Sequence, residues 1–528
     1  MIDKLSNQSR IIIATVLSFL FFATYNYFFI PKQEVTEQKT QVEKAQKVGS
    51  QPITSVAPSS SDIPSQVSKK SVEIITKVQA ASYELHIDRL GRISKFYLNE
   101  TKYKDENGDR IELIDSELVP YPLEIRFSDE NINSQAFATS YTASESEIKV
   151  ADKGTKLTLT QSLSDLKIVK TLTFFPNGNY DLSVTMSNPK EYFITPGFRP
   201  NVGIDSYTFH GSLIKEADET LSVIDDGDAT GKEAFANAIF AASSDKYYTT
   251  LFYNFDKGLD VVVSPVYEES PLLFIKGKNN LKLSGYLGPK EHTVLVAIDK
   301  RLTDVIEYGF FTFISRPLFM LLQYLHSILG NWGWSIVCMT LLIRLVLFPL
   351  TYKGMVSMNK LKALSPKIKE LQAKYGKDKQ KLNTHMMELY KKHGANPMGG
   401  CLPIVLQIPV FFAIYRVLQN TIELKAAPWI LWIHDLAVMD PYFVLPIAMG
   451  LTMFFHQRIT PTNFTDPMQE KIMKFLPLIF TFFFVSFPAG LTLYWFVNNL
   501  FSIAQQYYVN SLFAKGQKAE ITEKKAKK

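Results

Sequence analysis

The chain has 528 residues, of which 46% are hydrophobic and 20% are charged, and its formal net charge is +6. This length allows several domains, while two cysteines, both in apolar stretches, provide no disulfide framework. The apolar residues are concentrated in the first 30 positions and the last 200, which indicates a multi-span membrane protein with a soluble insert.

Residues 11–30 form the first apolar run, and Lys4 and Arg10 precede it. A cleaved signal peptide also starts with basic residues, but this run is longer than a usual signal core and lacks small residues suited to cleavage at its end. We therefore predict that residues 1–30 are an uncleaved transmembrane anchor. Its N-terminus is expected in the cytoplasm, because positively charged flanks stay on that side.

Residues 31–70 are rich in Gln, Lys, Ser and Pro without apolar periodicity, which is typical of a flexible linker. Residues 71–300 then show short segments of alternating apolar and polar residues, separated by Gly, Asn, Asp and Pro. This pattern predicts an antiparallel β-sandwich, and the region is long enough for one large core. Residues 294–298 are apolar throughout, which suits a strand buried on both faces.

After Arg301 the pattern becomes helical and apolar, and we predict an interfacial segment over residues 301–331. Its apolar part, residues 310–329, contains Arg316 and Pro317. These two residues favour an amphipathic helix that lies in the membrane interface over one that spans the bilayer.

Residues 332–351 are apolar and numerous enough to span a bilayer, since ~20 helical residues cover ~30 Å. Arg344 lies near the middle, where an arginine costs at least about 2.5–3.5 kcal/mol on insertion scales. Thr340 and Thr351 share its helical face. Because none of the five C-terminal spans contains Asp or Glu, we interpret Arg344 as a site for an anionic group. A structural role is the alternative.

Residues 352–395 are lysine-rich, with apolar residues at helical spacing on both sides of Gly376 and Asp378. They predict a helical hairpin, which the positive-inside rule places in the cytoplasm. The remaining predicted segments are four spans and a basic tail: 401–419, 441–455, 475–487, 491–509 and 510–528.

The anchor and the five later spans make six transmembrane helices in total. This number places both termini in the cytoplasm, residues 31 to about 330 outside, and every short lysine-rich loop on the cytoplasmic side. The spans 441–455 and 475–487 are short, so we expect local thinning of the bilayer.

Polar residues recur on one face of the last span, at Tyr494, Asn498, Ser502 and Gln505. On the span 401–419, Gln407 shares a helical face with Phe411 and Tyr415. Together with Thr340 and Arg344, these residues predict a polar cavity inside the bundle. The alternative for the neutral residues is interhelical hydrogen bonding that only holds the helices together.

Signatures of catalytic and cofactor sites are absent from the sequence. It contains no HExxH zinc motif, no Walker loop, no G-x-S-x-G elbow and no dinucleotide-binding glycine pattern. We therefore expect no enzymatic activity, no catalytic residue, no bound metal and no cofactor.

Three motifs in a fixed order point to a known family: TLLIRLVLFPLT (340–351), NPMGGCLPIVLQIPVFFAIY (396–415) and FPAGLTLYWFVNNLFSIAQQ (487–506). The lysine-rich hairpin lies between the first two, and YLGPK (286–290) ends the β region. In this arrangement the chain resembles, over essentially its whole length, the YidC-type membrane protein insertases of the Gram-negative form.

The resemblance implies an inner-membrane protein whose large periplasmic domain is similar to sugar-mutarotase folds but lacks their activity and is largely dispensable for insertion. It also implies a hydrophilic groove that is open to the cytoplasm and the lipid but closed to the periplasm. Arg344 and Thr340 match the groove arginine and its neighbouring threonine, and Tyr494 and Trp495 match an aromatic pair. Some relatives have Tyr where this chain has Trp495, so a hydroxyl function there does not carry over.

We therefore expect a membrane protein insertase and chaperone that works alone or with the Sec translocon. Its expected partners are nascent membrane proteins, the ribosome, the Sec translocon and the lipid bilayer, but not DNA. The expected groove residues are Arg344, Thr340, Gln407, Tyr494, Trp495, Asn498, Ser502 and Gln505. A hydrophobic slide for the substrate is expected at Ile404, Ile408, Phe411, Phe480, Phe483 and Phe484, although lipid contact and core packing also explain the aromatic run.

Two other hypotheses remain open from the sequence. A small-solute transporter could use Arg344 to bind an anion, but that design predicts repeated halves, and we find no internal duplication. An adaptor protein could instead work through its β domain. Deletion of residues 71–300 separates this hypothesis from the insertase, which should retain function.

Overall fold

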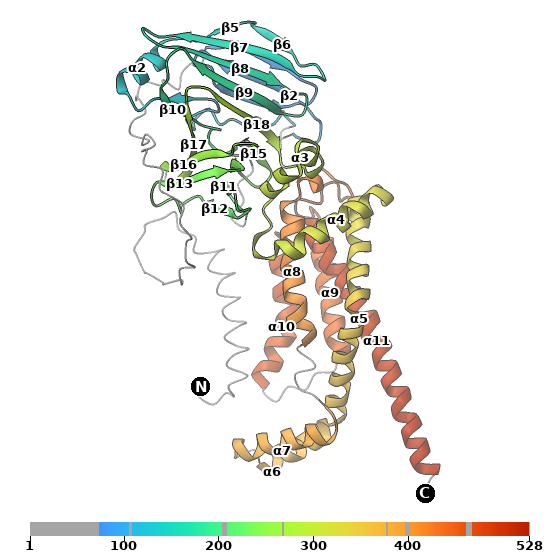
Figure 1. Cartoon of the computed structure of the whole chain (residues 1–528). Coiled ribbons are helices and arrows are strands. Elements are labelled where there is room, and N and C mark those ends of the chain that lie inside the picture. Colours follow the sequence, from blue (N-terminus) through green and yellow to red (C-terminus); the bar gives the residue numbers. More distant parts are fainter. Residues whose placement is uncertain are drawn as a thin grey trace.

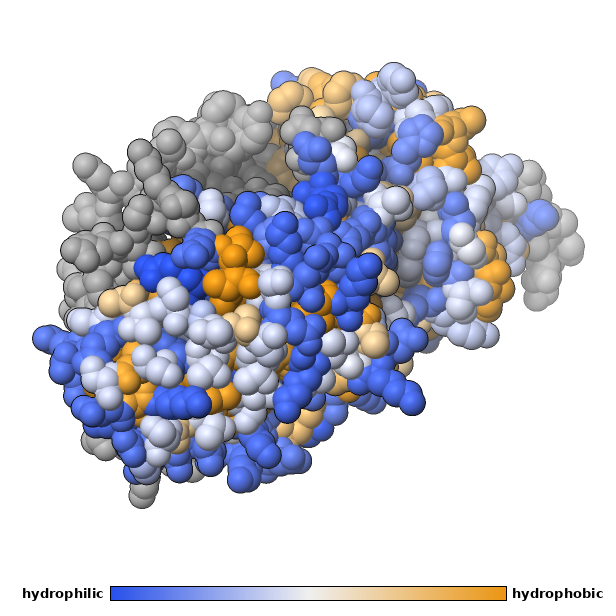
Figure 2. Space-filling view, turned by 90° about the horizontal axis from the view of Figure 1, so that it is seen from above, coloured by the Kyte–Doolittle hydropathy of each residue, from blue (hydrophilic) through white to orange (hydrophobic). Residues whose placement is uncertain are grey.

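A computed structural model describes residues 73–526 except 105–107, 203–207, 267–268, 376–377, 396–401 and 461–466. The predicted anchor and linker, residues 1–30 and 31–70, lie outside these described residues. A β-rich domain sits at one end of a bundle of helices, and helices project from the other end (Figure 1). Seen from the β-domain end, the surface is mostly hydrophilic, with scattered hydrophobic patches (Figure 2).

In its described residues the β domain contains three sheets, with strand orders β3-β2-β1-β6, β13-β16-β17-β10-β4 and β12-β11-β14-β15-β18-β9-β8-β7-β5. The strands are β1 (Ile74–Gln79), β2 (Tyr83–Asp88), β3 (Ile93–Leu98), β4 (Ile125–Arg126), β5 (Thr142–Ala143), β6 (Glu147–Lys149), β7 (Thr155–Ser162), β8 (Lys167–Phe174), β9 (Asn179–Met186), β10 (Glu191–Ile194), β11 (Gly211–Lys215), β12 (Leu221–Asp225), β13 (Glu233–Ala238), β14 (Phe240–Ser244), β15 (Tyr248–Tyr253), β16 (Leu259–Val266), β17 (Ser270–Lys278) and β18 (Leu281–Pro289). Among the described strand pairs, only β1–β6 is parallel.

Alternation of side chains explains how these strands share one core. In β7 and β8, which pair in antiparallel register, Leu157, Leu159, Ile168 and Leu172 are fully buried, while Thr158 and Thr171, which point to the other face, are only partly buried. Buried side chains from all three sheets form one hydrophobic cluster. The prediction of an antiparallel, β-rich domain is therefore confirmed for the described residues.

Two helices lie within or beside the sequence region that we predicted to be all strand. Asp129 caps the N-terminus of the helix α2 (Glu130–Ala138), and its side chain accepts hydrogen bonds from two backbone N–H groups. The predicted buried strand at residues 294–298 is wrong, because this segment belongs to the helix α3 (His292–Ile298). A short apolar run cannot by itself distinguish a strand from a helix. Here Leu295 is buried on one face, while Val296 remains 42% exposed.

The chain then crosses from the β domain to the bundle through two 3-10 turns, η3 (Lys300–Val305) and η4 (Gly309–Phe311), and the helix α4 (Thr312–Leu329). Asp304 connects the two parts: it pairs with Lys215 of β11 at 2.7 Å and also with Arg316 of α4. One face of α4 is buried, and the other exposes large apolar side chains, including Phe313 and Met320.

The bundle consists of α5 (Trp332–Ala363), α8 (Leu402–Asn420), α9 (Val444–Ile459), α10 (Pro467–Phe484) and α11 (Ala489–Ala526). Judged by length and composition alone, α5 is the only helix among the described residues that is long and apolar enough to cross a membrane. A 3-10 turn, η6 (Ile422–Leu424), lies in the loop between α8 and α9.

The helix ends differ from the predicted span ends. Both α5 and α11 continue well beyond residues 351 and 509, because a helix satisfies its own backbone hydrogen bonds and need not end where its apolar stretch ends. The helix α10 starts at Pro467, so its 18 residues cover about 27 Å. The predicted span 475–487 was short because it omitted the charged first turns of this helix.

The predicted hairpin contains α6 (Ser365–Tyr375) and α7 (Lys379–Lys392). Asp378 begins α7, and its side chain accepts a hydrogen bond from the Lys381 backbone N–H. A small cluster that includes Leu364, Ile368 and Ala395 packs between the two helices. These helices lie at the end of the bundle opposite the β domain (Figure 1).

Candidate functional site

A cavity of about 580 Å³ lies among the helices of the bundle. All five bundle helices contribute to its lining, in which polar and apolar residues are equally numerous. The lining residues are Arg344, Thr351, Gly354, Met355, Met358, Gln407, Ile408, Phe411, Met453, His456, Gln457, Thr460, Met473, Leu476, Pro477, Trp495, Asn498, Asn499, Ser502 and Gln506.

Arg344 is the charged centre of this cavity and is only 8% exposed. Its Nε donates a hydrogen bond of 2.7 Å to Oδ1 of Asn498 on α11. A guanidinium has five N–H donors, so this bond leaves donors available for a ligand. Among the described lining residues, no Asp or Glu balances the charge. The cavity can therefore hold an anionic group against a buried cation.

Neighbouring polar residues fix the helices around Arg344. Gln505 Nε2 donates to the Arg344 carbonyl oxygen at 3.4 Å, and Ser502 Oγ donates to the Asn498 carbonyl oxygen at 2.8 Å. Asn499 Nδ2 donates to the Met449 carbonyl oxygen at 3.4 Å, which joins α11 to α9. The bonds of Gln505 and Asn499 join α11 to α5 and α9, as interhelical polar contacts in membrane proteins do, whereas the bond of Ser502 lies within α11.

The predicted groove residues divide into two groups. Arg344, Gln407, Trp495, Asn498 and Ser502 line the cavity.

Thr340, Tyr494 and Gln505 are not part of the lining. Thr340 and Tyr494 are almost fully buried, and the Thr340 hydroxyl donates to the Ile336 carbonyl oxygen within its own helix. We therefore assign these two residues to packing beside the cavity.

The predicted slide residues are also divided. Ile408 and Phe411 line the cavity, whereas Phe480, Phe483 and Phe484 do not. The side chain of Ile404 lies outside the described residues.

The phenylalanines of α10 instead pack beside the cavity wall at Trp495. The ring centroids of Phe484 and Phe480 lie 5.3 and 6.0 Å from that of Trp495, and Phe411 contacts the same ring at 4.7 Å. The aromatic run therefore supports the wall through Trp495.

Several lining residues were not predicted, among them four methionines and His456, Gln457 and Gln506. The signal for two of them was present in the sequence. Met355 and Met358 follow Thr351 at i+4 and i+7, and therefore continue the face of Arg344. They were missed because the predicted span ended at residue 351.

The opposite end of the bundle is packed against the β domain. In the loop after α8, Ile422 joins the β-domain core, and Glu423 accepts a hydrogen bond of 2.9 Å from the His292 backbone N–H. Burial raises the pKa of Glu423 to about 7. Lys425 Nζ donates to the Tyr248 hydroxyl at 3.1 Å. This outer loop therefore joins the two parts of the chain.

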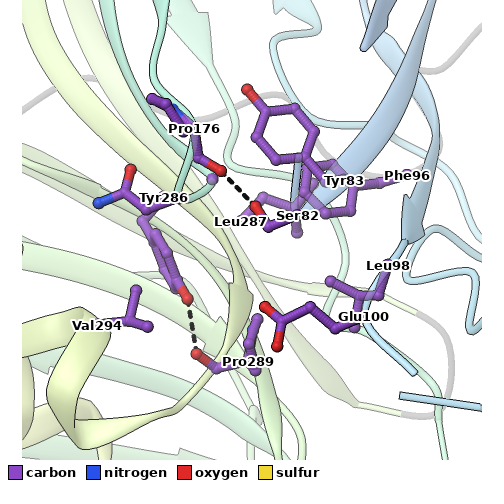
Figure 3. A pocket seen from close by; sticks show the side chains of 12 residues that line it. Ser82, Tyr83, Phe96, Leu98, Glu100, Pro176, Tyr286, Leu287, Pro289 and Val294 are labelled. Atoms are coloured by element: carbon purple, nitrogen blue, oxygen red, sulfur yellow. Dashed lines mark hydrogen bonds between the residues drawn. The ribbon is translucent and has the colours of Figure 1, made fainter. Parts of the chain in front are cut away.

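A second, smaller cavity of about 220 Å³ lies in the β domain near α3. It includes Tyr286, Leu287 and Pro289 of the YLGPK motif. The Tyr286 hydroxyl donates to the Pro289 carbonyl oxygen at 2.7 Å, and the Glu100 carboxylate extends towards Pro289 (Figure 3). The polar group of Tyr286 is thus used within the motif, which indicates a structural function for this segment.

No group of three or more His, Cys, Asp or Glu side chains that could hold a metal ion occurs in the described part of the chain. The chemistry of the main cavity therefore consists of one cation, neutral hydrogen-bonding groups and flexible apolar side chains. This combination can bind an anionic or amphipathic segment without a covalent step.

Comparisons with known proteins agree with this arrangement. A family model described as 60Kd inner membrane protein matches residues 324–517, and one described as YidC periplasmic domain matches residues 205–321. The membrane protein insertase YidC of Campylobacter jejuni is 54% identical over 515 residues, which cover 97% of this chain and 98% of that protein.

Two other relatives carry the same description. The protein from Wolinella succinogenes is 53% identical over 510 residues, which cover 96% of this chain and 95% of that protein. One from Helicobacter pylori is 46% identical over 532 residues and covers 96% of both chains.

Proposed function

Because this chain belongs to the YidC family of membrane protein insertases, we propose that it inserts and folds nascent membrane proteins through the cavity around Arg344. It is an inner-membrane protein with a periplasmic domain. The observation that carries the proposed mechanism is a single buried cation in a cavity where no described lining residue is acidic.

In the proposed mechanism, Arg344 attracts the acidic outer tail of an incoming chain into the cavity. The polar lining provides hydrogen bonds that reduce the cost of removing this tail from water. The apolar segment leaves sideways past Ile408 and Phe411, and its burial in lipid drives the step. No nucleotide hydrolysis is required.

The proposed topology has six spans, with the anchor followed by α5, α8, α9, α10 and α11. Both termini, the α6–α7 hairpin and the C-terminal tail from residue 510 are cytoplasmic, and residues 31 to about 330 are periplasmic. The lysines of the hairpin support this orientation through the positive-inside rule. The exposed apolar face of α4 supports a position of this helix at the periplasmic surface of the inner membrane.

The hairpin and the lysine-rich tail are the proposed contacts for the ribosome, whose RNA is anionic, and the Sec translocon is a proposed partner in assisted insertion. The same lysines would also be attracted to anionic lipid. Ribosome binding measured with lipid-free, detergent-solubilised protein separates a contact with ribosomal RNA from attraction to anionic lipid. Loss of binding when these lysines are replaced supports the RNA contact, and unchanged binding contradicts it.

Insertion of a single-span substrate into the membranes of depleted cells tests the proposed function. Wild type, Arg344→Ala and Arg344→Lys would be compared by protease accessibility of the substrate's outer tail. We expect Ala to reduce insertion of acidic-tailed substrates by about tenfold or more, and Lys to restore most of it, because the charge is retained.

Arg458→Ala is the matched control. Arg458 is an exposed arginine at the end of α9 that is not part of the cavity lining. Full insertion by Arg344→Ala, for acidic and neutral tails alike, would contradict the electrostatic mechanism and reduce Arg344 to a structural residue.

A further inference from the structure

Four methionines from three helices line one cavity. Met355 and Met358 come from α5, Met453 from α9 and Met473 from α10. The chain has 14 methionines in total, so this is a marked concentration. We call these four residues the methionine collar.

The collar differs from methionines that fill the bundle core. Met339 on α5 and Met449 on α9 are 0% exposed, whereas all four collar residues are only partly buried. A partly buried methionine that borders a cavity of about 580 Å³ has room to change its rotamer. The collar is therefore a movable lining.

The two collar residues of α5, Met355 and Met358, lie between Arg344 and the end of the bundle that carries the hairpin. Met355 and Met358 lie 11 and 14 residues after Arg344, which corresponds to about 17 and 21 Å along α5. In this direction α5 runs away from the β domain towards α6 and α7 (Figure 1). An apolar segment that enters from that end meets Met355 and Met358 before it reaches Arg344.

Methionine suits a surface that must accept many different apolar shapes. Its side chain is unbranched, has three rotatable bonds and carries a polarisable sulfur, so it adapts to side chains of different size. Leucine has a similar volume but is branched and less adaptable. His456, Gln457 and Gln506 line the same cavity and provide polar groups beside the collar.

We propose that the methionine collar binds the apolar segment of an incoming chain and determines how wide a range of apolar segments the cavity accepts. This inference rests on the proposed insertase function and adds the residues that select its apolar substrates. Arg344 then recognises the charge of the tail, and the collar recognises the hydrophobic segment next to it.

Site-specific photo-crosslinking tests contact directly. A photoreactive residue would replace Met358 or Met473 in the full-length protein, which would be exposed to ribosomes that carry an arrested single-span chain. We expect crosslinks to the apolar segment from both positions. Replacement of Met320 or Met439, which are exposed but are not among the lining residues, provides the control and should give none.

The same experiment separates failure of the collar from failure of the proposed function. A photoreactive residue would also replace Ile408 or Phe411. Crosslinks from these two positions without any from the collar would overturn the proposed function of the collar but support the groove. Absence of crosslinks from every cavity position would contradict the groove itself.

A quadruple Met→Leu variant tests selection. Substrates would share one acidic tail and equal hydrophobicity, but their apolar segments would be rich in Leu and Ala, in Val and Ile, or in Phe. We expect Leu/Ala segments to insert within about twofold of wild type, and bulky or β-branched segments to fall by about fivefold or more, because the stiffer lining fits fewer shapes.

A variant with Leu at Met320, Met387 and Met439 is the matched control, since these methionines lie outside the cavity lining. An unchanged substrate range, or an equal loss for all three segment types, would overturn the proposal. If the quadruple variant fails to accumulate, the crosslinking experiment still decides.

Discussion

At the scale of single residues, the pairing of Arg344 with Asn498 controls how much positive charge the cavity offers. The bond from Arg344 Nε to Asn498 Oδ1 is short, at 2.7 Å, and its acceptor is neutral. A neutral acceptor orients the guanidinium without cancelling its charge. A carboxylate in the same place would form a charge-assisted pair and compete with any anionic ligand.

Asn498→Asp should therefore reduce insertion of acidic-tailed substrates by about tenfold, close to the effect of Arg344→Ala. Asn498→Ala removes the bond but keeps the charge of Arg344, so we expect a smaller loss of about threefold or less. The measurement is the ratio of acidic-tailed to neutral-tailed insertion in the protease-accessibility assay. Equal ratios for the two variants would show that charge at this position is unimportant.

A second residue-scale prediction concerns Glu423 in the loop after α8. We call the contacts of this loop and of residues 300–316 with the β domain and the bundle the joint. Burial raises the pKa of Glu423 from 4.5 to about 7, with the nearby Glu291 acting in the same direction and Lys102 opposing it. The folded state therefore favours the neutral carboxyl. As pH rises above 4.5, the unfolded chain releases this proton first, and the stability of the folded form decreases until about pH 7.

Glu423→Gln keeps an acceptor for the His292 N–H but cannot ionise. We expect the variant to melt a few degrees higher than wild type at about pH 8 and nearly equally at about pH 4. Thermal unfolding of the detergent-solubilised protein at both values provides the measurement. Glu388→Gln, at an exposed site on α7, is the control, and the same shift in both variants would contradict the assignment.

At the scale of helices and strands, sequence periodicity located most elements but not their ends. Arg344 was identified because one helical face of an apolar stretch carried polar residues. Two collar residues, Met355 and Met358, were missed because apolarity decreases before α5 ends, although the helical face of Arg344 continues through them. Residues 294–298 were misassigned because five consecutive apolar residues fit the periodicity of a helix as well as that of a strand. The segment is helical in the structure, where α3 packs against the buried cluster of the bundle.

Which polar residues reach the cavity also depends on packing that sequence does not encode locally. Tyr494, Asn498 and Ser502 share one face of α11, yet only the latter two line the cavity. Tyr494 is covered because it joins the buried cluster between the helices. A helical face is wide enough to contact both a cavity and a neighbouring helix.

The close approach of α9 and α10 gives a prediction at this scale. A Cβ added to Gly450 would lie 1.8 Å from Thr481 Oγ1 on α10, so Gly450→Ala must separate the two helices or displace that side chain. We expect it to destabilise the protein by about 1–3 kcal/mol, measured as a lower melting temperature.

Gly516→Ala is the matched control, because Gly516 lies in α11 with nothing within 4 Å of the added Cβ. It should leave stability unchanged or raise it by up to about 1 kcal/mol, since Ala favours a helix. Equal melting temperatures for both variants would show that α9 and α10 can separate at no cost.

At the scale of the whole molecule, the β domain and the outer end of the bundle are joined by several independent contacts. Asp304 pairs with Lys215 and Arg316, and the Asn420 side chain donates to the Glu307 carbonyl oxygen at 2.6 Å. Ile422 belongs to the β-domain core. Opening of this joint would expose both apolar surface and buried polar groups, so we infer that the cavity works while the joint stays closed.

Cross-linking across the joint tests this inference. Cys338 and Cys401 would first be replaced, and then His292→Cys and Glu423→Cys would be joined by a short, reducible cross-linker. We expect the cross-linked protein to insert substrates within about twofold of the same variant before cross-linking, because the two segments already lie in contact. Single-cysteine variants treated in the same way control for modification. A loss of about fivefold or more that reverses on reduction would mean that the joint must open, and the collar and Arg344 would then act in a bundle that moves relative to the β domain.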